Sequence, residues 1–180
     1  SGVHHLDNLS GKSDLYVYFF LKGLDLLAEG GTLTLVTSNS WMDAGFGKRL
    51  KQYLIRDYDF KHILSSEVQR SFVEADINTA ISVINNTNGG VLRDFLQVTT
   101  LSTPYESVAD PENLWDLVYS PNGFEYYQFN DHPIALDDTP SHRAIAIPHI
   151  TLWSIAGGQL NNFQMSQLNG DTSNLDQIIS

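Results

Sequence analysis

The 180-residue chain contains no cysteine, so disulfide bonds and cysteine-ligated zinc sites are excluded. It also lacks the run of about 18 apolar residues that a membrane-spanning helix requires. Its first residues, SGVHHLDN, do not join a basic segment to an apolar one, so they do not resemble a secretory signal peptide. We therefore expect a cytoplasmic location and no membrane partner. The chain begins without methionine, which suggests the middle of a longer protein.

Basic residues are scarce in the second half of the chain. Residues 95–180 contain ten acidic side chains and a single basic one, Arg143, and the whole chain carries a net charge of −11. Neutralisation of phosphates dominates nucleic-acid affinity, so this half alone is a poor candidate for binding DNA. Residues 48–61 form a basic patch, which the solvated face of a helix explains at least as well.

Residues 12–37 show the clearest local pattern. Ser13 or Asp14 can cap a helix that runs to about Ala28, because apolar residues then recur at spacings of three and four. The expected inward face consists of Tyr16, Phe19, Phe20, Gly23, Leu24 and Leu27. Glycines at 30 and 31 are expected to end the helix, and the apolar residues 32–37 (TLTLVT) predict a buried strand.

The chain from residue 45 to residue 100 alternates between helix and strand patterns. A second helix is expected over 45–58, with Phe46, Leu50, Tyr53 and Leu54 facing inward, followed by strands over 60–64, 77–84 and 91–100. The strand–helix–strand unit over 32–64 predicts a parallel pair with a right-handed crossover, as in open α/β sheets. A turn at 85–90 (NNTNGG) predicts that the fourth strand is antiparallel to the third.

The remaining residues, 101–180, are punctuated by six prolines and predict an irregular α+β tail. A short helix is expected over 111–119, and edge strands over 144–148 and 150–155. The aromatic residues between 115 and 129 lie far from basic residues, so we interpret them as core or interface packing rather than as stacking platforms for nucleic-acid bases.

The central stretch resembles the later half of the catalytic domain of TaqI-like, amino-type DNA adenine methyltransferases of restriction-modification systems. In that family a Lys-x-Asp-Leu-Tyr-x-x-Phe helix, a Gly-Gly turn, an apolar strand, Asn-Ser-Trp and a loop phenylalanine follow in this order. The matching residues here are Lys12, Asp14, Leu15, Tyr16, Phe19, Gly30, Gly31, Asn39, Ser40, Trp41 and Phe72. The resemblance covers roughly residues 12–86 and implies a partial Rossmann-like sheet, the C-terminal half of a methyltransferase fold that uses S-adenosylmethionine.

The resemblance also implies roles for four residues. Phe72 occupies the position of the aromatic that stacks on the flipped adenine, where stacking restores part of the energy lost on leaving the duplex. Phe19 matches the aromatic that stacks on the adenine ring of the cofactor, and Asp14 and Tyr16, at the same helix start, are implied to be cofactor-binding as well. Packing alone explains each aromatic as a core residue, and helix capping alone explains Asp14.

Two elements of the family are missing from this sequence. No Asn-Pro-Pro-Tyr-type loop, which holds the target amine, precedes Lys12, and no Gly-x-Gly turn is present to cradle the cofactor. The family also usually has proline where Ser38 stands. We therefore expect no catalytic residue in this chain and an isolated chain that is inactive. The strand over 32–37 is expected to present an unpaired edge, through which the chain can associate with itself or with another chain.

These patterns lead to three hypotheses. In the first, residues 1–100 are the C-terminal half of a methyltransferase domain and residues 101–180 connect to, or begin, a target-recognition region; the partners are double-stranded DNA and a restriction or specificity subunit. In the second, the chain is a non-catalytic, methyltransferase-like interaction module that assembles with a partner subunit. In the third, it is an unrelated acidic α/β binding domain. The six histidines show no spacing typical of a metal site.

Overall fold

The computed structural model describes residues 14–43, 47–68, 78–87, 95–107, 125–129, 132–149 and 152. Within these residues the chain forms two α-helices, seven strands and two short 3₁₀ helices. In chain order they are α1 (Leu15–Leu26), β1 (Thr32–Ser38), η2 (Asn39–Met42), α2 (Gly47–Asp57), β2 (Asp59–Ser66), β3 (Thr79–Asn85), β4 (Phe95–Leu101), η3 (Tyr105–Ser107), β5 (Glu125–Phe129), β6 (His132–Asp138) and β7 (His142–Pro148). The expected α/β class is therefore confirmed for the described residues.

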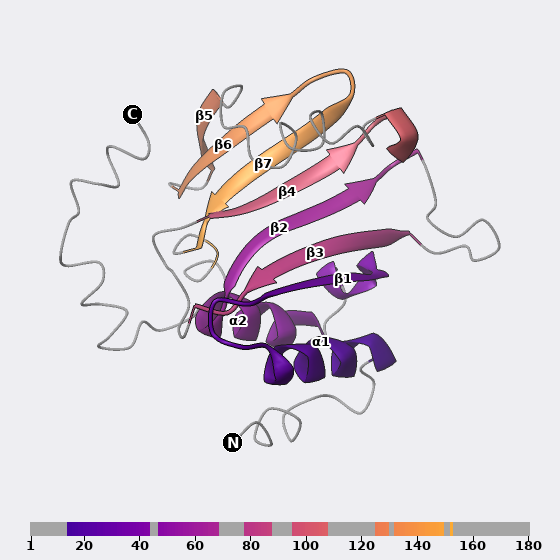
Figure 1. The fold of residues 1–180 in the computed structure, drawn as a ribbon. Coiled ribbons are helices and arrows are strands. Elements are labelled where there is room, and N and C mark those ends of the chain that lie inside the picture. The colour runs from indigo at the N-terminus through magenta and orange to yellow at the C-terminus, as the bar shows by residue number, and fades with distance from the viewer. Residues whose placement is uncertain are drawn as a thin grey trace.

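The strands form one mixed sheet with the order β1-β3-β2-β4-β7-β6-β5 (Figure 1). β3 lies between β1 and β2 and is antiparallel to both, so β1 and β2 run in the same direction without touching. The parallel orientation predicted for these two strands is thus correct, but they are not adjacent. The antiparallel strand inserted between them comes later in the sequence than both.

β4 is not a neighbour of β3 in the sheet. It pairs in parallel with β2 on one side and antiparallel with β7 on the other. β4 does run opposite to β3, as the sequence predicted, but β2 separates the two strands. A turn motif such as residues 85–90 specifies a reversal of direction, and it does not decide which strand becomes the neighbour.

The second half of the chain extends the same sheet. β4 runs across the predicted boundary between residues 100 and 101, and β7, β6 and β5 follow it in the sheet order. The prediction of an edge strand over 144–148 is wrong in its position, because β7 lies inside the sheet between β4 and β6. The expected helix over 111–119 lies outside the described residues, as does the strand over 150–155 apart from Leu152.

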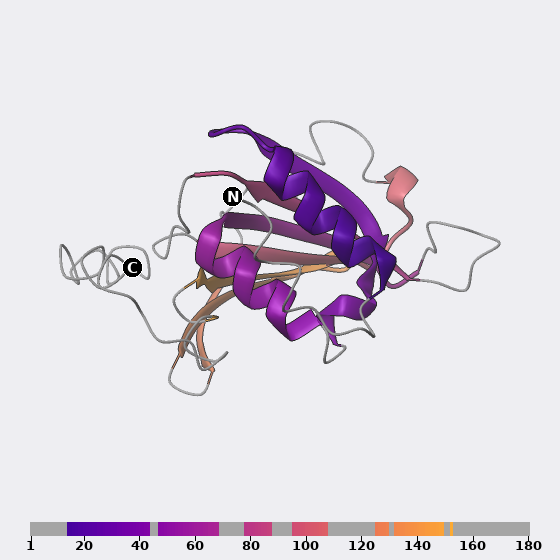
Figure 2. The ribbon, with the colours of Figure 1, turned by 90° about the horizontal axis from the view of Figure 1, so that it is seen from below.

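Both helices cover the same face of the sheet (Figure 2). α1 begins after Asp14, whose carboxylate accepts a hydrogen bond from the backbone nitrogen of Leu15 at 2.6 Å, so the predicted cap is confirmed. The helix ends at Leu26, two residues earlier than expected. Gly30, with φ of +73°, shapes the following turn rather than the helix end itself, and its nitrogen donates to the carbonyl of Asn86 at 2.7 Å.

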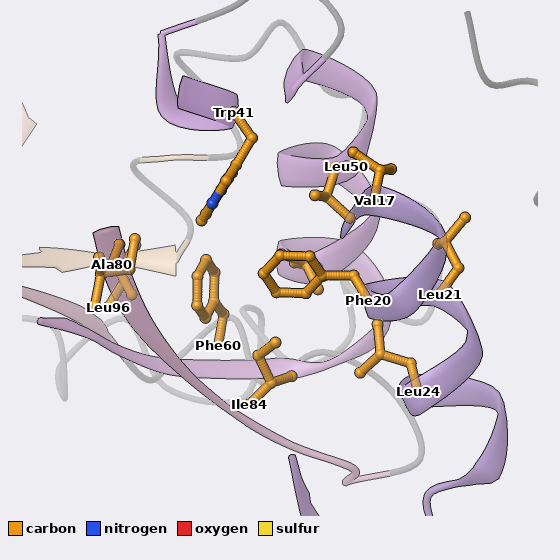
Figure 3. Packing of buried hydrophobic residues seen from close by; sticks show 12 residues of the cluster. Val17, Phe20, Leu21, Leu24, Trp41, Leu50, Phe60, Ala80, Ile84 and Leu96 are labelled. Carbon is orange, nitrogen blue, oxygen red and sulfur yellow. The ribbon is translucent and has the colours of Figure 1, made fainter. Parts of the chain in front are cut away.

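The main core lies between the helices and this face of the sheet (Figure 3). Its buried members are Val17, Phe20, Leu21, Leu24, Trp41, Leu50, Leu54, Phe60, Ile63, Ala80, Ile84 and Leu96. Trp41 has no exposed surface, and its ring meets Phe20 edge-on at 5.6 Å and Phe60 at 6.1 Å between centroids. The inward positions predicted for Leu50 and Leu54 in the second helix are confirmed, whereas Phe46 lies outside the described residues. No helix within the described part of the chain is long and apolar enough to span a membrane.

Candidate functional site

One edge of the sheet brings together several segments that the sequence singled out. β1 ends at Ser38 and β2 at Ser66, and both ends lie beside the first residues of β3, because Ser38 opposes Thr79 and Ser65 opposes Ala80. The backbone nitrogen of Asn39, the first residue of η2, donates to the carbonyl of Asn78 at 3.0 Å. We call this region, where β1 and β2 end and β3 begins, the carboxyl edge.

Hydrogen bonds between side-chain hydroxyl groups connect the first turn of α1 to the carboxyl edge. The phenol oxygen of Tyr16 lies 2.9 Å from Ser40 Oγ, which lies 2.8 Å from Ser38 Oγ. Ser38 also accepts a hydrogen bond from the backbone nitrogen of Ser40 at 3.2 Å, so it caps η2. This contact gives Ser38 a structural role at the position where the resembling family usually has proline. Ser38 and Ser40 were not predicted as site residues, although Ser-Asn-Ser directly after a strand is a typical capping pattern.

Phe19 and Phe20 follow each other in α1, so their side chains point in directions roughly 100° apart around the helix. The side chain of Phe20 is fully buried, whereas that of Phe19 is 60% exposed. The sequence placed both on the inward face, and for Phe19 this prediction is wrong. The buried face is instead formed by Val17, Phe20, Leu21 and Leu24. Within the described part of the chain, the ring of Phe19 therefore remains largely exposed to solvent.

Phe72 lies outside the described residues, but the chain on both sides of it is described. β2 ends at Ser66, Val68 follows it, and the chain is described again from Asn78, which is bonded to Asn39. The connection that contains Phe72 therefore leaves and rejoins the sheet at the carboxyl edge. Asp14, Tyr16 and Phe19 lie in the first turns of α1, which Tyr16 ties to this same edge.

Within the described part of the chain, no group of three or more His, Asp or Glu residues could hold a metal ion. His62 lies in β2 opposite Val83 and Gln97 and is 3% exposed. Its Nε2 atom has no hydrogen-bond partner among the residues that the structure describes. Burial lowers the pKa of His62 from 6.5 to about 4, because the charged form is desolvated there.

This shift predicts a loss of stability in mild acid. The unfolded chain binds a proton at His62 near pH 6.5, whereas the folded chain does so only near pH 4. The stability of the fold relative to the unfolded chain is therefore unaffected by His62 above pH 6.5 and falls as the pH drops from 6.5 to 4. We expect His62 to lower the free energy of unfolding by about 2 kcal/mol between pH 7 and pH 5. Urea denaturation at both pH values measures this change. In the H62Q variant, the free energy of unfolding should depend less steeply on pH. An equal pH dependence of the free energy of unfolding in the wild type and in H62Q would contradict the prediction.

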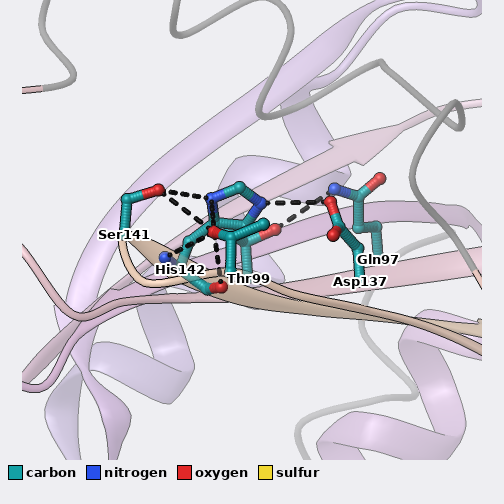
Figure 4. Close-up of polar contacts among 6 residues, drawn as sticks. Gln97, Thr99, Asp137, Ser141 and His142 are labelled. Carbon is teal, nitrogen blue, oxygen red and sulfur yellow. Dashed lines mark hydrogen bonds and ion pairs between the residues drawn. The ribbon is translucent and has the colours of Figure 1, made fainter.

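A second polar cluster closes the hairpin between β6 and β7 (Figure 4). His142 Nε2 lies 3.3 Å from Asp137 Oδ2, and its Nδ1 lies 3.1 Å from the hydroxyls of Ser141 and Thr139. Serine, histidine and aspartate in contact are typical of hydrolases. Here, however, Thr139 also bonds the backbone nitrogen and carbonyl of His142, so the same side chains bridge the two strands at their turn. We assign the cluster this structural role.

Comparison with known proteins adds three findings. Residues 4–72 match the family model of the Eco57I restriction-modification methylase. The chain is 25% identical over 76 residues to the Type II methyltransferase M.AccI of Acinetobacter calcoaceticus, and these residues are 42% of this chain. It is 32% identical over 78 residues, 43% of this chain, to the Type II methyltransferase M.BstVI of Geobacillus stearothermophilus. Each match spans only 14% of the relative.

Among solved structures, the M protein of the Type I restriction enzyme EcoKI superimposes on this chain with a TM-score of 0.50 and 12% sequence identity. The superposition covers 93% of this chain and 45% of that protein. At this identity the likeness concerns the fold alone. It extends well beyond residue 72, where the match to the family model ends.

Proposed function

The first part of this chain is related to the restriction-modification methylases, and from this premise we propose that residues 1–100 are the later half of the catalytic domain of a site-specific DNA adenine-N6 methyltransferase. The methyl donor is S-adenosylmethionine, and the acceptor is the exocyclic amine of an adenine flipped out of double-stranded DNA. The enzyme acts in a restriction-modification or phage-defence system, with a restriction or specificity subunit as a further partner. Residues 101–180 connect to, or begin, its target-recognition region.

The exposure of Phe19 is the observation that carries this proposal. A buried core position would explain an apolar ring without any ligand, but 60% of Phe19 is in contact with solvent. In the proposed enzyme this ring stacks on the adenine ring of the cofactor, a contact worth about 0.5–1.5 kcal/mol beyond the burial of apolar surface. Asp14 caps the helix and Tyr16 fixes its first turn to Ser40, so both residues hold the ring in place.

Phe72 is proposed to stack on the flipped adenine. Extrusion of a base costs unpairing and unstacking energy, and an aromatic face in the pocket returns part of it. The segment that contains Phe72 begins and ends at the carboxyl edge, to which the first turn of α1 is also tied. This placement supports a single site in which one aromatic faces the cofactor and the other faces the target base.

The remaining machinery comes from outside these residues. Neither the Asn-Pro-Pro-Tyr-type acceptor loop nor the glycine-rich cofactor turn occurs in the sequence. S-adenosylmethionine supplies the methyl group when it is bound, and the residues of this chain contribute stacking surfaces and their support. We therefore propose that the isolated chain transfers no methyl group, and that a longer methylase polypeptide contains both missing elements.

The proposal is tested by two alanine variants in that longer polypeptide. F72A should lower kcat/KM for transfer of a labelled methyl group to DNA by roughly ten- to a hundredfold, the energy of one stacked base. F19A should weaken binding of S-adenosylmethionine, measured by calorimetry, by roughly three- to tenfold. Y18A is the matched control, because Tyr18 is also an exposed aromatic of α1 but lies on another side of the helix.

The outcomes separate the competing explanations. Unchanged kinetics in F72A, or unchanged cofactor affinity in F19A, would refute the role proposed for that residue. Methyl transfer by the 180-residue chain alone would show that the donor and acceptor sites are complete without further residues. If the longer polypeptide does not bind S-adenosylmethionine at all, the alternative function, a non-catalytic interaction module, is favoured. The outer edge of β1, which no other described strand pairs with, is the feature that supports this alternative.

A further inference from the structure

The face of the sheet opposite the two helices is buried over its middle strands, although neither described helix lies on it (Figure 2). Leu96 and Val98 of β4 pack into the main core on the helix side, so the alternation of side chains along a strand points the residues between and after them to the other face. Residues paired with these across the ladders share that face. Its buried members, all 9% exposed or less, are His62, Gln97, Thr99, Leu101, Ala135, Ala144 and Ala146. We call this face the second face.

The burial of the second face is confined to one part of the sheet. Val36 on β1 is 54% exposed, and Ile81 and Val83 on β3 are half-buried. From β2 through β4 and β7 to β6, the side chains on this face are almost completely buried. Since this burial arises within a single chain, the segment that covers β2, β4, β7 and β6 belongs to the chain itself.

The chain leaves β4 on the second face. Tyr105, in the short helix η3 that follows β4, packs against Leu64 and Leu101, and both leucines lie on this face. From there the chain continues to Glu125 at the start of β5, and the order of the sheet places β7 and β6 between the two strands. Residues 108–124, which make this connection, therefore begin on the buried side of the strands that they must pass.

The other long segment outside the described residues leaves the sheet on the opposite side. His149, directly after β7, has its Nε2 atom 2.8 Å from the carbonyl oxygen of Phe60, and Leu152 packs against the main core on the helix side. The residues after 160 are rich in asparagine, glutamine and serine, which offer little apolar surface for a cover. The C-terminal segment is therefore less suited to the second face than residues 108–124.

The sequence of residues 108–124, VADPENLWDLVYSPNGF, fits a covering role. The pattern predicts a helix over 111–119, because an aspartate that can cap it precedes a proline at its first position. Leu114, Trp115 and Val118 then share one side of the helix, and Asp116 points away from that side. Such a helix has one apolar side to bury and one charged side to expose.

We propose that residues 108–124 pack across the second face, with the apolar side of a helix over 111–119 against the strip formed by Ala135, Ala144 and Ala146. These alanines lie on the adjacent strands β6 and β7, and Ala135 opposes Ala146, so their short side chains leave room for large ones. Three strand spacings, about 14 Å, separate β4 from β5, and a helix over 111–119 is also about 14 Å long.

The consequence is that the second half of the chain is fixed to the sheet rather than joined to it by a free linker. The inference concerns the packing of the 180-residue chain and does not depend on the proposed function. If that function holds as well, the connection into the target-recognition region starts from a fixed position on the catalytic sheet.

Thiol labelling tests the proposal, because the chain contains no cysteine of its own. A144C places a thiol on the second face, and A80C places an equally buried thiol on the helix side. The double substitution L114D/V118D puts carboxylates on the apolar side of the proposed helix. It should speed the labelling of A144C by iodoacetamide at least about tenfold and leave that of A80C unchanged. D116N, on the other side of the helix, is the matched control and should change neither rate.

Cross-linking gives a second measurement, which does not require the aspartate substitutions. A short bifunctional maleimide should join A144C to V118C, whereas V36C, on the same face but exposed on β1, should not be joined to V118C. If L114D/V118D also speeds the labelling of A80C, the chain has unfolded and the cross-link decides. A144C that stays protected in a folded L114D/V118D chain would overturn the proposal. So would the absence of a cross-link between A144C and V118C, or equal cross-linking of A144C and V36C.

Discussion

Replacing Trp41 with alanine is expected to lower the free energy of unfolding by about 3–5 kcal/mol, the usual cost of removing a large buried aromatic side chain. Trp41 is fully buried at the centre of the main core and contacts Phe20 from α1 and Phe60 from β2. Its removal leaves a cavity where helix α1, the sheet and η2 meet. Because small domains are stable by only about 5–15 kcal/mol, W41A should be partly unfolded at moderate temperature.

Two variants distinguish the loss of packing from other effects. W41F keeps an aromatic ring in the core and should cost clearly less than W41A, since Trp41 Nε1 has no hydrogen-bond partner within the described structure that the change would break. Y18A removes an aromatic ring that is 41% exposed and should change stability by about 0.5 kcal/mol or less. Thermal unfolding followed by far-ultraviolet circular dichroism gives the comparison. A W41A variant as stable as Y18A would contradict the central packing role of Trp41.

The first hundred residues show what local sequence patterns predict well. The Gly-Gly turn, the short β-branched run and the amphipathic pattern of the second helix each specify one element through its own residues. Accordingly α1, β1, α2, β2, β3 and β4 were all predicted, with boundaries within a few residues of those observed. The neighbours in the sheet were not predicted, because the pairing of β3 between β1 and β2 depends on contacts between distant segments.

The orientation of Phe19 was mispredicted for a related reason. α1 is apolar around most of its circumference, with Lys22 and Asp25 as its only charged residues. Spacings of three and four therefore define more than one possible inward face, and only packing against the sheet selects the one that contains Phe20. The strand β6 was missed because proline at 133 and consecutive aspartates at 137 and 138 disfavour a strand prediction. The strand β5 lies in the aromatic run that was interpreted only as core or interface packing.

The candidate site was predicted only through family resemblance. Nothing in the local sequence places the start of β3 at the carboxyl edge, since that arrangement arises from the pairing of β3 with β1. The hydroxyl contacts among Tyr16, Ser40 and Ser38 likewise join residues from a helix and a strand end. The roles proposed for Phe19 and Phe72 remain predictions, which the kinetic and binding experiments described above address.

Replacing Gly47 with alanine is expected to destabilise the fold by about 3 kcal/mol or more, although the change adds a single methyl group in the first turn of α2. A Cβ atom at this position would overlap the carbonyl oxygen of Trp41 and lie 2.7 Å from its carbonyl carbon. These are backbone atoms of η2, and the buried ring of Trp41 holds that backbone in place. Either α2 or η2 must therefore move, and each movement disturbs the core on which both pack.

G23A is the matched control for this effect. A Cβ at Gly23 would lie 3.0 Å from two methyl carbons of Leu33, which can rotate away because they end a flexible side chain. Alanine is also favoured over glycine inside a helix by roughly 1 kcal/mol, so the two effects should nearly cancel. Urea denaturation of both variants measures the contrast. If G47A were as stable as G23A, the close approach of α2 to the backbone of η2 would be wrong. The contact between Gly47 at the start of α2 and the backbone of Trp41 would then be wrong as well.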